Sequence, residues 1–219
     1  MKSLSLLVGA SALIATSAAD ATFVRWDVVS VGTVAGRDIY QLWGVFDSPS
    51  NVMLNVLQHD IVSGTMNAQH TDAYVDDSSV SSGHWNASYT SASTAATSNQ
   101  YRDSYVTISG KTGAQSQTAL DPSFGTGASM SSVPYHAGWY TSNPSAPIVV
   151  GATLRMKFMQ IALVAGDAGY TAHVGIGYKA STATTTPQWG WGNYTVGVPA
   201  PGAVALLGLA GLVSRRRRA

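Results

Sequence analysis

Cysteine and glutamate are both absent from the 219 residues of this sequence. Without cysteine, the chain forms no disulfide and offers no thiol nucleophile or cysteine-ligated metal site. Glutamate and lysine are the usual formers of surface helices, and lysine is scarce too, whereas the abundant Ser, Thr, Asn, Asp and Gly favour strands, turns and loops. The composition therefore predicts a domain that is poor in helix.

Charge is also scarce, because Asp, Glu, Lys and Arg together make up 11% of the residues. The formal net charge of +1 arises at the two ends, from Lys2 and the run Arg215–Arg218. Between Thr22 and Val198 there are seven basic residues and ten aspartates, which gives a net charge of −3. Nucleic-acid binding needs a basic patch that holds phosphates, so we expect no nucleic-acid partner.

The first apolar run has the length of a signal peptide rather than of a membrane span. Leu4–Ala15 follows the single charge of Lys2, and the small residues Ala19 and Ala21 then form a cleavage sequence. A second small-x-small sequence ends at Ala18 and is an alternative cleavage site. We therefore expect a signal peptide over residues 1–21 and a single domain over residues 22–197.

The second apolar run, Gly202–Val213, is too short to cross a membrane comfortably. A helix of this length would measure about 18 Å, against about 30 Å for the hydrocarbon core. Pro199 and Pro201 prevent the helix from extending backwards. The arginines after it stay charged and remain on the cytoplasmic side. The run suits a transient membrane helix better than a permanent anchor, although an ordinary C-terminal anchor is the alternative.

This tail resembles the PEP-CTERM sorting signal of exported proteins in Gram-negative bacteria. The resemblance covers residues 198–219, about a tenth of the chain, and one position departs from the pattern, since Ala200 replaces the usual glutamate. It implies recognition by an exosortase-type enzyme, transient tethering to the inner membrane and delivery to the cell surface or the extracellular space, often with extracellular polysaccharide. The residues that carry it are Val198, Pro199, Ala200, Pro201, Arg215, Arg216, Arg217 and Arg218.

Strand-like patterns recur through the domain and are separated by Gly, Pro, Asn and Asp. The sequence predicts an all-β fold, an antiparallel β-sandwich of jelly-roll type, with a signal helix before it and a hydrophobic helix after it. The expected strands are 23–30, 39–46, 52–57, 101–109, 154–164, 171–178 and 191–198.

Large apolar residues of these strands are expected to form the core, whereas the polar tract Ser78–Asn99 is expected to form a mobile, protease-sensitive loop. The predicted core residues are Trp26, Trp43, Phe46, Leu54, Val106, Ile108, Met156, Phe158 and Ile161.

Catalytic motifs are missing from the sequence. It contains no Gly-x-Ser-x-Gly motif and no closely spaced histidine pair. His59–Asp60 and His70–Thr71–Asp72 are weak candidates for a metal-dependent hydrolase, and Asp72, Asp76 and Asp77 for a calcium site, although a solvated acidic turn explains the aspartates more simply. We therefore expect no catalytic residue, no metal and no cofactor.

Aromatic residues beside turn-rich sequence are the remaining signal. Tryptophan and tyrosine faces stack on sugar rings, and neighbouring amides or carboxylates bind hydroxyl groups. The candidates for a carbohydrate-binding surface are Trp139, Tyr140, Trp189 and Trp191. The alternative is that these rings fill the core, and Trp189 and Trp191 share one side of a strand in either case.

The first interpretation is therefore an exported, non-enzymatic protein of the cell surface or extracellular matrix with a structural or adhesive role. The second is a carbohydrate-binding module for extracellular polysaccharide, and a secreted hydrolase comes third.

Overall fold

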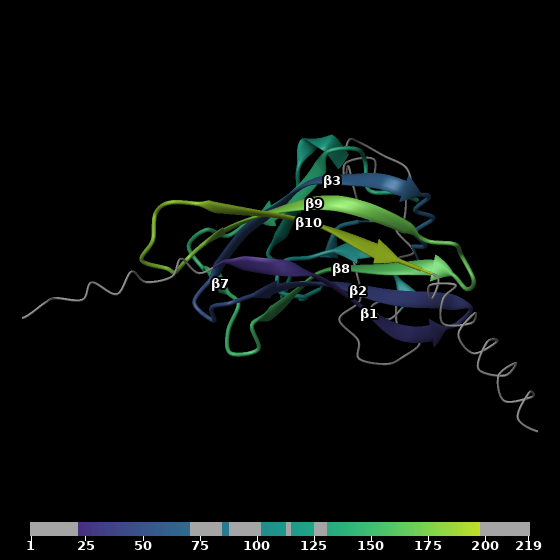
Figure 1. Ribbon diagram of the computed structural model, residues 1–219, viewed down its shortest axis with the longest axis horizontal. Helices are drawn as coiled ribbons and strands as arrows, with labels where there is room; N and C mark the ends of the chain where they lie inside the picture. Colours follow the sequence, from purple (N-terminus) through teal and green to yellow (C-terminus); the bar gives the residue numbers. More distant parts are fainter. Residues whose placement is uncertain (1–21, 71–84, 88–101, 113–114, 125–130, 198–219) are drawn as a thin grey trace, which may run out of the picture.

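The computed structural model describes residues 22–70, 85–87, 102–112, 115–124 and 131–197 (Figure 1). These residues form an all-β domain of two antiparallel sheets that pack as a sandwich. In Figure 1, β3, β9 and β10 form the upper layer, and β8, β2 and β1 the lower layer. Several features expected from the sequence lie outside the described residues. They are the signal peptide with its cleavage site at Ala19 and Ala21, the tail over residues 198–219 and both flanking helices.

Sheet A has four strands in the order β1, β2, β8 and β4. Their bounds are Phe23–Val34 for β1, Arg37–Phe46 for β2, Arg155–Val164 for β8 and Tyr105–Val106 for β4.

Sheet B has the order β10, β9, β3, β6 and β5, and β7 also pairs with β3. The bounds are Gln188–Val196 for β10, Tyr170–Lys179 for β9, Val52–Gly64 for β3, Ala137–Thr141 for β6, Thr118–Leu120 for β5 and Ile148–Val149 for β7.

The hairpin between β1 and β2 shows how local sequence sets the register. Val34 pairs with Arg37, which leaves Ala35 and Gly36 as a two-residue turn. Both turn residues have positive φ, 51° and 76°, as a type I′ turn requires. This turn matches the right-handed twist of the two strands, and their pairing continues back to Phe23 and Phe46.

An aromatic cluster joins the two sheets at one end of the sandwich. The ring of Trp26 from β1 lies 5.5 Å from that of Phe158, edge-on, and its Nε1 donates to the carbonyl of Val174 in β9, at 3.2 Å. Phe46 lies 5.8 Å from Tyr178 of sheet B. These contacts tie the edge strand β1 to the opposite sheet.

Seven of the nine predicted core residues are buried, and two are only partly buried. Trp43 lies on the outward side of β2, where the guanidinium of Arg155 stands 5.4 Å from its ring centre. Leu54 is next to an irregularity of β3 between Met53 and Asn55, and Met53 takes the buried position instead. The prediction was wrong for Trp43 because it alternates with the inward-facing Leu42, Gly44 and Phe46, and wrong for Leu54 because the bulge in β3 shifts which side chains face inward.

Sheet A is buried along both sides of β8. Every residue from Met156 to Leu163 is buried, including Lys157 and Gln160. Tyr105 of β4 and Gly110, which follows this strand, lie against the Lys157 side chain. A strand buried on both sides shows no alternation, and β8 is apolar at all of these positions except Lys157 and Gln160.

Most expected strands are confirmed, with two differences. The expected strand 101–109 is reduced to Tyr105–Val106, and β5, β6 and β7 were not anticipated. Most of the tract Ser78–Asn99 lies outside the described residues, but Trp85 within it is fully buried. Among the residues that the structure describes, no helix has the length and apolar character needed to cross a membrane.

Candidate functional site

Strand β10 places tryptophans and glycines on opposite sides of sheet B. Along Gln188–Val196, Trp189 and Trp191 are exposed, whereas Tyr194 and Val196 are buried. The alternating glycines point inward, where a methyl group on Gly190 would lie 2.6 Å from the ring of Phe23. The interior is already filled by aromatic residues of β1, so the two tryptophans of β10 face outward.

Both exposed indoles rest on glycines of the neighbouring strand β9. Trp189 pairs with Gly177 and Trp191 with Gly175. A methyl group on Gly177 would meet the benzo ring of Trp189 at 2.5 Å, and one on Gly175 would meet that of Trp191 at 2.7 Å. Each benzo ring therefore occupies space that a side chain on the paired glycine would fill, together with Asn55 at Gly177 and Leu57 at Gly175, while 55% of Trp189 and 45% of Trp191 remain exposed.

The surroundings of the indoles extend across sheet B. Asn55 of β3 pairs with both Gly177 and Tyr140, so Trp189 and Tyr140 lie in one row across four strands. Three strand spacings separate their Cα atoms by about 14 Å. We call this outer surface of sheet B the aromatic face, and it comprises Asn55, Leu57, Tyr140, His173, Trp189, Trp191 and Asn193.

Polar groups border the aromatic face at its Trp191 end. The imidazole of His173 is nearly parallel to the Trp191 indole, at 9° and 5.5 Å between ring centres. His173 Nδ1 lies 2.6 Å from Asn193 Oδ1. Across the next strand, Asp60 Oδ2 lies 2.9 Å from Nδ1 of His136, and the backbone N–H of His136 donates to Asp60 Oδ1 at 2.9 Å. The apolar surface of Trp191 therefore lies next to exposed hydrogen-bonding groups.

The four sequence-predicted aromatic residues do not all belong to this surface. Trp189, Trp191 and Tyr140 do, since each is at least 45% exposed. Trp139 is fully buried in the core, where its Nε1 donates to the carbonyl of Thr107 at 3.2 Å. Trp139 and Tyr140 are consecutive in β6, and consecutive residues of a strand point to opposite sides. We therefore leave Trp139 out of the site.

Sequence reasoning missed Asn55, Leu57, His173 and Asn193 of the aromatic face. These residues lie on three strands far apart in the chain, and only the pairing of β3, β9 and β10 brings them together. One signal was available, because Gly175 and Gly177 alternate within a strand in the same way as the Trp-Gly-Trp-Gly sequence of β10. Glycine inside a strand often marks a place where another group approaches the backbone closely.

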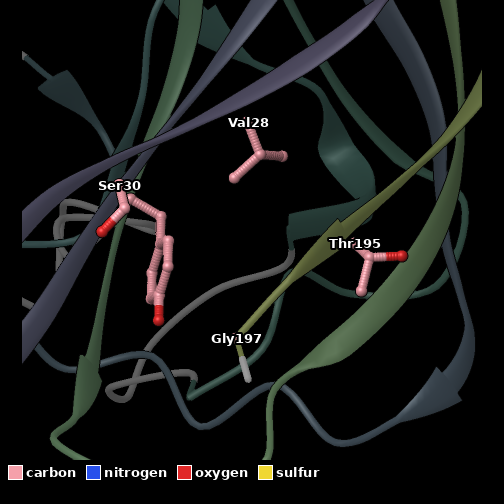
Figure 2. A pocket seen from close by; sticks show the side chains of 5 residues that line it. Val28, Ser30, Thr195 and Gly197 are labelled. Atoms are coloured by element: carbon pink, nitrogen blue, oxygen red, sulfur yellow. The ribbon is translucent and has the colours of Figure 1, made fainter. Parts of the chain in front are cut away.

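Apart from the aromatic face, a pocket lies between the edges of the two sheets (Figure 2). This pocket of about 290 Å³ is lined by Val28 and Ser30 of β1, Tyr40 of β2, and Thr195 and Gly197 at the end of β10. Burial and the nearby charges of Asp38 and Asp167 raise the pKa of the Tyr40 hydroxyl, so this group stays protonated. The lining offers hydroxyl groups and one apolar side chain but no charged group.

Two buried polar clusters serve the packing of the sandwich. His59 Nε2 lies 2.5 Å from Tyr194 Oη, which in turn lies 3.2 Å from Tyr170 Oη. Burial lowers the pKa of His59 to about 4 and raises the pKa of both tyrosine hydroxyls. The other cluster joins Lys157 Nζ to Tyr105 Oη at 2.9 Å.

Of the two histidine–aspartate candidates, His59 and Asp60 do not contact each other in the way expected, and the expected partner of His70 lies outside the described residues. His59 points into the core towards Tyr194, whereas Asp60 contacts His136 on the outside. His70 lies 3.5 Å from Asp103. Asp72, Asp76 and Asp77 lie outside the described residues, and within the described part of the chain no group of three or more His or Asp side chains is placed to hold a metal ion.

Comparison with known proteins gives no match for this chain, whether with protein-family models, curated proteins or solved structures.

Proposed function

We propose that this chain is an exported, non-enzymatic protein that binds extracellular polysaccharide through the aromatic face. The observation that supports it most is the arrangement of Trp189 and Trp191. The benzo ring of each lies against a glycine of β9, and about half of each tryptophan is exposed on the outer surface of sheet B. A sugar ring presents an apolar face of C–H groups, which stacks on such a surface while its hydroxyl groups reach polar neighbours.

Preorganisation strengthens this proposal. The indoles are held by the glycines beneath them, and Trp191 is also held by the parallel ring of His173. A ligand that stacks on them immobilises few further side-chain rotamers, and each immobilised side chain would otherwise cost about 0.5–1.5 kcal/mol. Sites on strands are also more precise than sites on loops.

The sorting tail makes polysaccharide the preferred ligand among those that bind exposed tryptophan. Its resemblance implies delivery to a surface that is rich in polysaccharide. The part of the proposal concerned with sorting rests on residues 198–219 and is tested separately, by mass spectrometry of the protein recovered from the cell surface. Recovery of protein that still carries the complete arginine tail would favour a plain membrane anchor.

Two finer expectations from the sequence remain proposals. One is the lack of catalytic activity, which hydrolysis of a polysaccharide by the purified chain would overturn. The other is the jelly-roll winding, which depends on the connection between β3 and β4, and that connection passes through residues 71–84 and 88–101, outside the described residues.

Affinity electrophoresis tests the binding function. The full chain, purified in a detergent without a sugar head group, is run through gels that contain soluble β-glucan, galactomannan, arabinoxylan or amylopectin. We expect at least one polysaccharide to retard the wild-type chain and the change Trp189→Ala with Trp191→Ala to abolish the retardation. Loss of a single stacked ring, at about 0.5–1.5 kcal/mol, weakens binding by about twofold to tenfold.

Two controls make the result specific. Trp43→Ala removes a partly buried tryptophan from the other sheet and should leave the retardation unchanged. Trp139→Phe keeps a ring in the core and should also leave it unchanged. Absence of retardation by every polysaccharide, together with binding to lipid vesicles or self-association that needs Trp189 and Trp191, would replace the proposal with a membrane or dimer surface.

A further inference from the structure

We propose that the aromatic face selects an uncharged glycan, and that His173 and Asn193 bind neighbouring hydroxyl groups of a sugar ring stacked on Trp191. This inference rests on the proposed function and adds the chemical class of the ligand and the residues that recognise it.

The distribution of basic residues supports an uncharged ligand. Among the strands of the structure, Arg25, Arg37, Arg155 and Lys157 belong to sheet A, and sheet B carries only Lys179. An acidic polysaccharide is normally held by arginine or lysine, whose donors pair with carboxylate or sulfate. The aromatic face has no arginine, and its one basic neighbour is Lys179, which lies on the same side of β9 two residues beyond Gly177, at the Trp189 end and away from His173.

The acidic residues of sheet B also act against an anionic glycan. Asp60 lies opposite His173 in the β3–β9 pairing. The Asp121 carboxylate lies over Gly138, because a methyl group there would be 3.0 Å from Asp121 Oδ2 and 3.1 Å from Leu57 Cα. Two carboxylates therefore border the aromatic face, and a uronate placed on Trp191 would be repelled by both.

The hydrogen bond between His173 and Asn193 fixes what each side chain offers to a ligand. Asn193 Oδ1 is an acceptor, so His173 Nδ1 carries the proton that it shares across 2.6 Å. In the neutral ring, Nε2 is then an acceptor. Asn193 Nδ2 keeps two N–H donors, so an acceptor and a donor stand next to each other at the border of the Trp191 ring.

A pair of neighbouring hydroxyl groups matches this arrangement. One hydroxyl donates to His173 Nε2, and the next accepts from Asn193 Nδ2. The planes of the imidazole and the indole differ by 9° and their centres are 5.5 Å apart, so a sugar that contacts the exposed part of Trp191 lies next to His173. Stacking on Trp191 supplies most of the affinity, and the polar pair sets the orientation of the sugar.

The test compares each neutral polysaccharide with its own oxidised form, in which the primary hydroxyl has become a carboxylate. The full chain is analysed by affinity electrophoresis at low and high salt. We expect the oxidised form to bind at least about tenfold more weakly at low salt, with the difference shrinking as salt screens the repulsion. Equal or tighter binding of the oxidised form would overturn the charge argument.

Three variants test the hydroxyl-binding pair. His173→Phe keeps a ring beside Trp191 and removes Nε2, and Asn193→Ala removes the donor. Each should weaken binding of the neutral polysaccharide about threefold to tenfold, in the range of one hydrogen bond. Thr171→Ala breaks a comparable 2.9 Å contact with Thr195 between the same two strands and should leave binding unchanged.

The outcomes separate this inference from the proposed function. If Trp191→Ala weakens binding while His173→Phe and Asn193→Ala bind as the wild type does, the aromatic face binds glycan but the polar pair does not recognise it. If no polysaccharide of either form is bound, the proposed function fails together with this inference.

Discussion

Lys157 provides a stability prediction that follows directly from its surroundings. Its ammonium group is buried in the outer layer of sheet A, and its hydrogen-bond partner is the hydroxyl of Tyr105, at 2.9 Å. Within the described residues, no carboxylate forms an ion pair with it. Burial therefore lowers the pKa of Lys157 from 10.5 to about 8.

The direction of the pH dependence follows from these two values. Between pH 8 and pH 10.5 the unfolded chain holds the proton while the folded chain has released it, so unfolding takes up a proton and stability rises with pH. Below pH 8 both states are protonated, and the full cost of the buried charge, about 3 kcal/mol, is present. Raising the pH from about 7 to about 9.5 should recover about 2 kcal/mol of this cost.

Urea unfolding of the full chain, followed by tryptophan fluorescence at several pH values, measures the effect. Lys157→Met keeps most of the volume and removes the charge, so it should be more stable than the wild type at neutral pH, and the advantage should shrink by about 2 kcal/mol at about pH 9.5. Lys179→Met is the control, because it removes a partly exposed lysine from β9. Parallel pH profiles of the wild type and Lys157→Met would refute the reasoning.

Two further predictions concern the core and the glycines. The pKa of His59 is lowered from 6.5 to about 4 in the folded chain. Between these two pH values the unfolded chain binds a proton at His59 and the folded chain does not, so stability should fall by up to about 3 kcal/mol from pH 6.5 to pH 4. His59→Gln should flatten this fall in acid urea titrations, and an unchanged slope would contradict the assignment. Gly190→Ala, whose methyl group meets the Phe23 ring inside the sandwich, should cost about 1–3 kcal/mol in the same assay. Gly175→Ala would push the half-exposed Trp191 ring towards solvent rather than into the core, so it should cost less stability than Gly190→Ala yet weaken polysaccharide binding. A larger loss of stability for Gly175→Ala than for Gly190→Ala, or unchanged binding, would contradict this account.

The strands could be predicted from the sequence because their evidence is local. The apolar and aromatic residues of β1 and β2 alternate, and the turn between them is formed by adjacent residues. The short strands β5, β6 and β7 were missed because their formation depends on pairing with partners distant in the chain. A two- or three-residue strand has too little sequence to show a period.

The candidate site was only half predictable for a related reason. Alternation placed Trp189 and Trp191 on one side of a strand, but it does not say whether that side faces the core. Phe23 and Trp26, more than 160 residues earlier, decide this, because their rings occupy the space above Gly190 and Gly192. The orientation of β10 thus depends on a contact between the two sheets that a local pattern does not contain.

The glycines of β9 and β10 distinguish a binding surface from a surface that only completes a sandwich. A glycine within a strand costs about 0.5–1 kcal/mol relative to alanine. At Gly190 and Gly192 this cost is offset inside the protein, because Phe23 and Trp26 pack where side chains would stand.

Gly175 and Gly177 point to the outer side of sheet B but are buried beneath neighbouring side chains, at positions where a threonine or valine would suit the strand better. Because they carry no side chain, the benzo rings of Trp189 and Trp191 occupy the space next to the β9 backbone. The indoles that cover the glycine backbone offset part of the destabilisation that glycine causes within a strand. Threonine at both positions would avoid that destabilisation altogether. Under the proposed function, this arrangement serves a ligand that contacts the exposed indoles, and a ligand with flat apolar faces and hydroxyl groups at its edge would fit both the rings and the polar pair beside Trp191.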